Sequence, residues 1–230
     1  MTQIALDPLD LAALLCSRVC HDVISPVGAI VNGLEILEDE KDADMRAEAL
    51  QLIRASAENA SARLQFCRLA FGAAGSAGAS IDTGDAEKVA RGLFPDAKIR
   101  LDWRAPRVLL PKNKVKLILN LCLIAAAAIP RGGVITVETP TLPAGAGDDG
   151  ATEPSIAIRV TAQGQNAKLA PLTAAILAGA PTEAIDAHAI QPYYAALVAQ
   201  AAGMRLNAET AADFVAIEAT PTAPARSEAA

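Results

Sequence analysis

The chain has 230 residues, which is room for one or two domains, and its apolar content of 52% excludes a chain that is disordered throughout. Aromatic residues make up only 3% while alanine is abundant, which favours close-packed helices over an aromatic-rich sheet protein. The net charge of -6 and the absence of clustered Lys and Arg in the sequence argue against nucleic acid as the main partner.

Residues 7–38 are predicted to form one long helix. Asp7 is a suitable N-cap, and Pro8 suits the first helical position. Apolar residues then recur at steps of three and four, which predicts a continuous apolar stripe along one face. The stripe consists of Ala12, Cys16, Val19, Val23, Val27, Ile30, Leu34 and Leu37.

A second helix is predicted over residues 44–71, after a polar turn at 38–44. It has an apolar stripe of its own, through Ala49, Ile53, Ala57, Ala60, Leu64, Cys67 and Phe71. Two helices of similar length joined by a short turn form an antiparallel hairpin, and a hairpin alone cannot cover stripes this long. We therefore expect self-association into a dimeric four-helix bundle.

The rest of the chain predicts an α+β domain. Domain limits are expected at 1–75 for the hairpin, 76–84 for a small-residue linker, 85–219 for the second domain and 220–230 for a disordered tail. Within the second domain, helices are expected at 85–93, 112–129, 167–177 and 186–202, and strands at 98–103, 133–139, 155–161, 204–209 and 214–219. This order predicts a mixed sheet with helices on one face.

The sequence also sets expectations for cysteines and for location. The four cysteines fall in apolar helical patterns and are expected to be small buried residues, without metal: Cys16, Cys20, Cys67 and Cys122. The first residues lack the features of a signal peptide, and the longest apolar run, 117–129, is too short to span a bilayer. A soluble, cytoplasmic protein without membrane contact is expected.

His21 is the candidate reactive residue, because a helical wheel places it away from the apolar stripe. Its neighbours one turn away, Ser17 and Ser25, are small and leave the imidazole open to a large partner. A phosphoryl acceptor needs such access and a neutral ring nitrogen. Asp22 is expected to orient the ring or accept its proton.

Three more residues are candidates for partner binding. Leu14 is expected to be an exposed docking contact, and Arg18 to offset phosphate charge. Arg63 is a candidate phosphate contact from the second helix. The alternative interpretation of His21 is an ordinary surface histidine. Metal binding is disfavoured, because the other histidine, His188, is remote and is expected on a helix surface or at a packing site.

A motif in the first helix favours the reactive interpretation. It resembles the H-box of two-component histidine kinases, with an acidic residue after the histidine and a proline five residues on: Cys20-His21-Asp22-Val-Ile-Ser25-Pro26-Val-Gly28-Ala-Ile30. An interior proline costs a helix about 3 kcal/mol, so it is rarely incidental. Over nearly its full length the chain resembles the ChpT-type histidine phosphotransferases of bacterial cell-cycle phosphorelays.

The second domain resembles a degenerate histidine-kinase ATP-binding (Bergerat/GHKL) fold. Kinases keep two asparagines four residues apart in the N-box, whereas here Asn120 is followed by Ile124. Alanine stands at position 162, where the kinases have the aspartate that binds adenine, and residues 184–190 lack the glycines of the nucleotide lid. The resemblance therefore implies that no ATP and no other cofactor is bound.

The resemblance implies a phosphorelay in which phospho-His21 passes a phosphoryl group between aspartates of receiver domains, with Mg on the receiver. The implied partners are a CckA-like hybrid kinase and the regulators of the CtrA-like and CpdR-like classes, acting on a homodimer. Two other functions stay open: a divergent ATP-dependent sensor histidine kinase, and a non-catalytic dimeric adaptor of response regulators.

Overall fold

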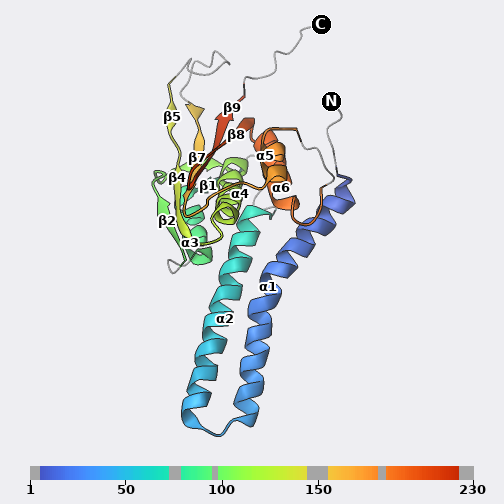
Figure 1. The fold of residues 1–230 in the computed structure, drawn as a ribbon, viewed down its shortest axis with the longest axis vertical. Helices are drawn as coiled ribbons and strands as arrows, with labels where there is room; N and C mark the ends of the chain where they lie inside the picture. Colours follow the sequence, from blue (N-terminus) through green and yellow to red (C-terminus); the bar gives the residue numbers. More distant parts are fainter. Residues whose placement is uncertain (1–5, 73–78, 95–97, 144–154, 181–184, 223–230) are drawn as a thin grey trace.

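The computed structural model describes residues 6–72, 79–94, 98–143, 155–180 and 185–222. A long helical hairpin projects from a domain of sheet and helices (Figure 1). The predicted α+β class, with a hairpin first and a sheet-and-helix domain after it, is confirmed.

The hairpin consists of α1 (Pro8–Asp39) and α2 (Ala43–Ala70), close to the predicted limits. Aspartates cap both helices at their N-termini. The carboxylate of Asp7 accepts a hydrogen bond of 2.8 Å from the backbone N–H of Leu9, and that of Asp42 accepts 2.9 Å from the N–H of Asp44. The three-residue connection at the tip forces the helices to run antiparallel.

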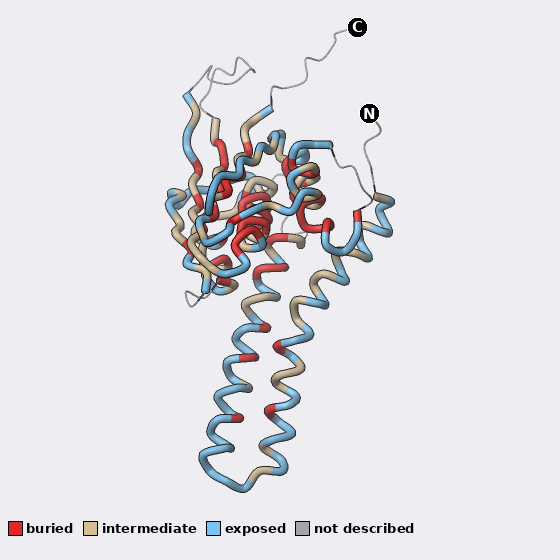
Figure 2. Tube along the Cα trace, in the orientation of Figure 1, coloured by how far each residue is buried: buried red, intermediate tan, exposed pale blue. Residues whose placement is uncertain are grey.

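The hairpin covers the apolar stripes of α1 and α2 only in part, as their length predicts. The inner face, between the helices, buries small residues: Pro26, Gly33, Ala49, Ser56 and Ala60. A second face carries large apolar side chains that the single chain leaves exposed: Ile24, Val27, Val31, Leu34, Leu50 and Leu64. Figure 2 shows the hairpin as mostly exposed, with buried residues only at intervals.

Pro26 lies inside α1 and is buried against α2. A proline has no N–H, so the helical hydrogen bond from position 26 to the carbonyl of Asp22 cannot form. Figure 1 shows α1 changing direction part-way along, and its first part crosses below α6. The bend therefore brings the N-terminal part of α1 onto the second domain.

A five-stranded mixed sheet forms the centre of the second domain. Its order is β2 (Ile99–Trp103), β4 (Gly133–Glu138), β7 (Ile158–Gln163), β9 (Phe214–Pro221) and β8 (Met204–Ala211). β2 and β4 are parallel, and the other neighbours are antiparallel. The side chains of Ile135, Val160 and Ile217 are fully buried on the covered face.

Four helices accompany this sheet: α3 (Thr83–Leu93), α4 (Lys112–Ala128), α5 (Pro171–Leu177) and α6 (Ile190–Ala201). α4 is the central one, with eleven buried residues, and it packs against β4, β7 and β9 on one side and α6 on the other. Buried residues alternate with partly buried ones along β4 and β7, as expected for a sheet with helices on one face.

Two short strand pairs were not predicted as such. β1 (Ser80–Asp82) pairs with β3 (Leu109–Pro111), and β5 (Thr141–Leu142) pairs with β6 (Ser155–Ile156). β1 and the first residues of α3 fall in the segment 76–84 expected to be linker, and β9 continues into the expected tail. Most of that tail and residues 73–78 of the linker region lie outside the described residues.

The C-terminal end of α2 is built into the second domain. Phe66 and Ala70 are buried, and the ring of Phe66 packs edge-to-face on that of Phe94, the residue after α3, with 6.4 Å between the ring centroids. The Nδ2 of Asn120 donates to the carbonyl of Ala70 at 3.1 Å, and the buried Lys116 donates to that of Phe71 at 3.4 Å. The last carbonyls of α2, which no helical N–H can reach, are thus satisfied by α4.

By length and composition alone, α1 is long and apolar enough to cross a membrane, with a mean hydropathy of 1.4 over its most apolar window. This is weak evidence for a span, because apolar helices that pack in protein interfaces pass the same test. In the described part of the chain, α1 instead lies along α2 and against α6.

Candidate functional site

His21 stands on the outside of α1, and its side chain is 86% exposed. Ser17 and Ser25, one turn to either side, are also exposed, as the helical wheel predicts. At Gly28, two turns along, an added Cβ would meet no atom within 4 Å. The imidazole is therefore open to a macromolecule approaching from the side of the hairpin.

Asp22 lies beside this imidazole and is itself held in place. Its Oδ1 is 3.5 Å from Nδ1 of His21, and its Oδ2 accepts a hydrogen bond of 3.0 Å from Nε of Arg18. Arg18 and Asp22 are one helical turn apart, and their side chains are 31% and 21% exposed. Arg18 therefore fixes a carboxylate on the Nδ1 side of the ring and leaves Nε2 facing solvent.

Arg63 of α2 lies at the same level of the hairpin as Arg18 and Asp22. All three line one cavity of about 240 Å³, together with Phe66, Cys67, Phe71, Leu93, Phe94 and Leu123. Burial, followed by the charge of Asp22, raises the pKa of the Cys67 thiol above its ordinary value. The Nε of Arg63 donates a hydrogen bond of 2.6 Å to Oδ1 of Asn59. The structure therefore places Arg63 in the same cavity as Asp22, without a direct contact with the imidazole of His21.

Leu14 is not the exposed residue that its sequence position suggested. It is half-buried and packs on a cluster formed by Ile176, Ile185, Ala189, Ile190 and Tyr193 of the second domain. The Tyr193 hydroxyl accepts a hydrogen bond of 3.0 Å from the N–H of Leu6. The bend at Pro26 explains the difference, because it turns the first part of α1 onto α6.

His188 also differs from its prediction, since it lies in a turn before α6 and not on a helix or at a packing site. Its side chain is 95% exposed, with Nδ1 3.7 Å from Asp186. The backbone N–H groups of His188 and Ala189 both donate to Asp186 at 2.9 Å, which fixes the turn. His188 is remote from His21 in sequence, although it lines a cavity with Arg18, the partner of Asp22.

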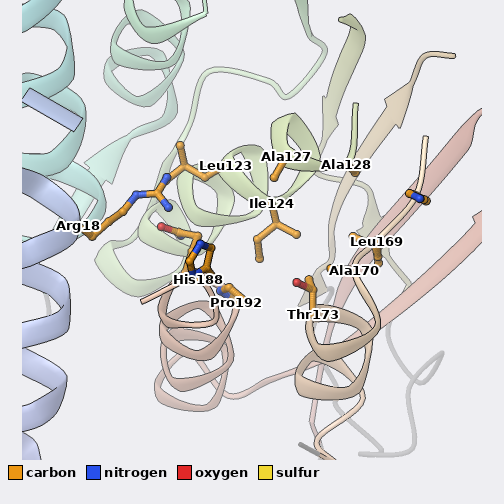
Figure 3. A pocket seen from close by; sticks show the side chains of 12 residues that line it. Arg18, Leu123, Ile124, Ala127, Ala128, Leu169, Ala170, Thr173, His188 and Pro192 are labelled. Carbon is orange, nitrogen blue, oxygen red and sulfur yellow. The ribbon is translucent and has the colours of Figure 1, made fainter. Parts of the chain in front are cut away.

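A second cavity, of about 120 Å³, lies where α4, α6 and the start of α5 meet. Figure 3 shows Arg18 of α1 at one end, Thr173 and Ala170 at the other, and His188 and Pro192 between them. Ile124, at the position where the kinases have their second N-box asparagine, is among the lining residues. Pockets for drug-sized ligands have volumes of roughly 300–1,000 Å³, so this cavity is small for a nucleotide.

Asn120, the asparagine that the N-box resemblance retains, is fully buried and serves as a structural connection. Its Nδ2 donates to the carbonyls of Ala70 and Lys116, and its Oδ1 accepts from Nε2 of Gln191 at 2.7 Å. Sequence analysis missed Gln191, although a glutamine in the apolar run of α6 was a signal that its side chain has a buried partner.

The expectation that all four cysteines are buried holds for only two of them. Cys67 and Cys122 are buried, whereas Cys16 and Cys20 are exposed in the single chain. Complete burial raises the pKa of Cys122 to about 12. Within the described ranges, no group of three or more His, Cys, Asp or Glu could hold a metal ion.

Comparison with known proteins identifies the family. The model of the histidine phosphotransferase C-terminal domain matches residues 83–214. The protein phosphotransferase ChpT of Brucella abortus (strain 2308) is 52% identical over 217 residues, which is 94% of this chain and 98% of that protein. The chain belongs to the ChpT family. The resemblance inferred from the H-box is thus confirmed, and so is a protein phosphotransferase activity.

One solved structure supports a phosphotransferase fold for the chain. The structure of a bacterial phosphotransferase matches with a TM-score of 0.80 at 48% identity, over 96% of this chain and all of that one. The histidine kinase AdeS of Acinetobacter baumannii is similar at a lower level, with a TM-score of 0.43 at 10% identity, over 88% of this chain and 97% of that one. The bacterial phosphotransferase therefore shares the hairpin and the second domain described above.

Proposed function

We propose that the chain relays a phosphoryl group between aspartates of receiver domains through a phosphohistidine at His21. The observation that carries this proposal is the exposed imidazole with an anchored carboxylate, on a chain of a phosphotransferase family. The open surroundings of the ring provide room for a folded receiver domain. His21 is thus the acceptor in one half of the relay and the donor in the other.

The geometry supports in-line transfer at Nε2. In a neutral imidazole with its proton on Nδ1, the lone pair of Nε2 attacks the phosphorus of an aspartyl phosphate. The new N–P bond forms as the P–O bond breaks, and the aspartate leaves as a carboxylate with the bonding electrons. Asp22, 3.5 Å from Nδ1, stabilises the positive charge that develops on the ring.

The second half of the relay reverses these steps. The carboxylate of another receiver attacks the phosphorus, the N–P bond breaks, and its electron pair returns to Nε2. Positioning supplies most of the rate, with the Mg ion provided by the receiver. The chain itself then needs no ATP, which fits the isoleucine at position 124 and the small cavity beside it.

The exposed apolar face of the hairpin supports a homodimer. Cys20, Ile24, Val27, Val31 and Leu34 recur at steps of four and three on α1, the spacing of a helical bundle seam. A double substitution, Ile24→Glu with Val31→Glu, should turn the dimer into a monomer in analytical ultracentrifugation. Leu109→Glu, at an exposed apolar residue outside the hairpin, is the matched control and should leave the dimer intact.

The chemistry of the transfer calls for receiver domains as donor and acceptors. The family resemblance suggests a CckA-like hybrid kinase as donor and CtrA-like and CpdR-like regulators as acceptors, which would meet the chain in the cytoplasm. Neither nucleic acid nor a membrane surface takes part in the transfer.

Transfer from a purified phosphorylated receiver, with labelled phosphate, tests the function. The wild-type chain should acquire label within minutes and His21→Ala should acquire none. Glu209→Ala, an exposed substitution on β8, controls for handling and should behave as wild type. Equal labelling of the His21→Ala chain would favour the adaptor interpretation, and labelling of the wild-type chain by ATP alone would favour a kinase.

A further inference from the structure

The ion pair between Arg18 and Asp22 is the least exposed arginine–carboxylate pair among the described residues. Its side chains are 31% and 21% exposed, whereas every other such pair has an arginine at least 43% and a carboxylate at least 29% exposed. Both residues line a cavity with Leu123 of α4, so the second domain contributes to this shielding. A shielded ion pair is weakened less by salt than one on the open surface.

The two carboxylate oxygens of Asp22 have different partners. Oδ2 accepts the hydrogen bond of 3.0 Å from Nε of Arg18, and Oδ1 lies 3.5 Å from Nδ1 of His21. The carboxylate therefore cannot turn Oδ1 away from the imidazole without disturbing the pair with Arg18. A distance of 3.5 Å is long for a hydrogen bond, but contacts of this kind commonly tighten when the partner docks and charge develops on the ring.

A carboxylate held at Nδ1 determines which nitrogen of the neutral ring carries the proton. A histidine side chain that is free in water prefers the proton on Nε2, and a hydrogen-bond acceptor at Nδ1 reverses that preference. Attack on an aspartyl phosphate through Nε2 needs a lone pair there, and hence the proton on Nδ1. The chain therefore has to hold His21 in the tautomer that an isolated imidazole disfavours.

We propose that Arg18 is a positioning residue, which acts through Asp22 to keep the proton of the neutral His21 ring on Nδ1. This inference rests on the proposed function and specifies how the acceptor nitrogen is prepared before a receiver docks. It differs from the phosphate contact that the sequence suggested for Arg18, because Nε of Arg18 is engaged on the Nδ1 side of the ring.

Nitrogen-15 NMR of the imidazole side chains measures the tautomer directly, on the full chain without a receiver. The chain has only two histidines, so the variant His188→Gln assigns the signals. At about pH 8.5, where an imidazole is neutral, wild-type His21 should carry its proton mainly on Nδ1. In Arg18→Met, about half or more of the population should have the proton on Nε2 instead.

Two further variants separate the pair with Asp22 from the mere loss of an arginine. Arg18→Lys should keep the wild-type tautomer, because the contact joins one nitrogen to one oxygen and lysine also pairs with an aspartate four residues on. Arg91→Met is the matched control. It breaks a pair of the same spacing, with Glu87 on α3, and should leave the His21 tautomer unchanged.

Single-turnover kinetics with a phosphorylated receiver distinguish positioning from partner binding. Arg18→Met should lower the maximal rate of transfer by about threefold to tenfold, with the dissociation constant of the receiver changed by less than about twofold. Arg18→Lys should recover most of the rate, and Arg91→Met should match the wild-type chain in both quantities.

A wild-type His21 with its proton mainly on Nε2 would overturn the proposal, and so would a tautomer that Arg18→Met leaves unchanged. A weaker affinity for the receiver at an unchanged maximal rate would also contradict it, because Arg18 would then be a partner contact. If Arg18→Met fails to fold, the wild-type tautomer still decides. The NMR result does not depend on phosphotransfer, so it stands even if His21→Ala accepts the label and the proposed function fails.

Discussion

The side-chain amide of Gln191 donates to that of Asn120 across 2.7 Å, in the buried contact where the hairpin joins the second domain. Asn120 also donates to the carbonyl of Ala70, 50 residues before it in sequence, so the pair connects α6 with the last turn of α2. The relationship gives Asn120, the asparagine of the N-box resemblance, a structural role that needs no nucleotide.

Asn120→Leu should be strongly destabilising. It leaves the carbonyl of Ala70 and the Nε2 of Gln191 buried without partners, at a cost of about 2–4 kcal/mol in the free energy of unfolding. Asn113→Ala, on the first turn of the same helix, is the matched control. This control variant loses one exposed hydrogen bond to the carbonyl of Ala201, so its free energy of unfolding should fall by less than about 1 kcal/mol. Urea unfolding measures both, and equal losses would show that the buried network contributes little.

Two glycines of α1 should respond oppositely to alanine. At Gly33 an added Cβ would lie 2.6 Å from Cγ1 of Ile53 and 3.4 Å from the carbonyl of Ala49, whereas at Gly28 it meets nothing within 4 Å. Gly28→Ala should raise the free energy of unfolding by up to about 1 kcal/mol, because alanine has a higher helix propensity than glycine. Gly33→Ala should be less stable than Gly28→Ala by about 1–3 kcal/mol, because overpacking outweighs the same gain. Thermal unfolding of both variants with similar midpoints would contradict the close packing of the hairpin.

Much of the fold could be predicted because its elements depend on local sequence. The limits of α1 follow from the Asp7 cap and from regular apolar spacing. β1 and β3 were missed because three-residue strands carry no periodic pattern. The start of α6 was placed too early, since the carboxylate of Asp186 accepts from the N–H groups of the next turn and holds it out of the helix.

The candidate site, like the fold, could be predicted only where it depends on local sequence. Arg18, His21 and Asp22 lie within one turn of a single helix, so sequence spacing was enough to group them. The burial of Leu14 and the pairing of Gln191 with Asn120 depend on how distant segments dock. A glutamine in the apolar run of α6 indicates a buried partner but not which residue it is, and nothing in the local sequence shows that α6 covers Leu14. The exposure expected for Leu14 was therefore wrong.

Acid should remove the stabilising effect of one capping carboxylate. The pKa of Asp82 lies below its ordinary value of 3.8, first because the N–H of Gly84 donates to it and second because Arg107 does. A lowered pKa means that the stabilisation is present above the ordinary pKa and is lost as pH falls through the folded-state value.

Asp82→Ala should therefore lower the unfolding temperature at pH 6, and the difference from wild type should shrink as the pH falls below about 4. Differential scanning calorimetry between pH 6 and pH 2 measures the difference in unfolding temperature between Asp82→Ala and wild type. Glu209→Ala on β8 is the control for general effects of acid. A difference that stays constant down to pH 2 would show that the charge of Asp82 contributes nothing.

Asp22 should affect the rate of phosphoryl transfer more than the affinity for the receiver. Asp22→Asn keeps the size of the side chain but removes the charge that faces Nδ1 of His21 and the ion pair with Arg18. We expect the single-turnover rate of transfer from a phosphorylated receiver to fall about tenfold to a hundredfold, with the affinity for the receiver nearly unchanged. Rapid-quench kinetics at several receiver concentrations separate the two quantities. An unchanged rate would remove Asp22 from the mechanism.

The most direct test of the account is the position of the phosphoryl group after transfer. The full chain, incubated with a phosphorylated receiver and fragmented without acid, should carry the group on His21 as an N-phosphohistidine. His188 is an internal comparison, because it is equally exposed and also has an aspartate close to Nδ1. Phosphate on His21 alone is the predicted result. Phosphate on His188, on a carboxylate or on no residue of the chain would contradict it.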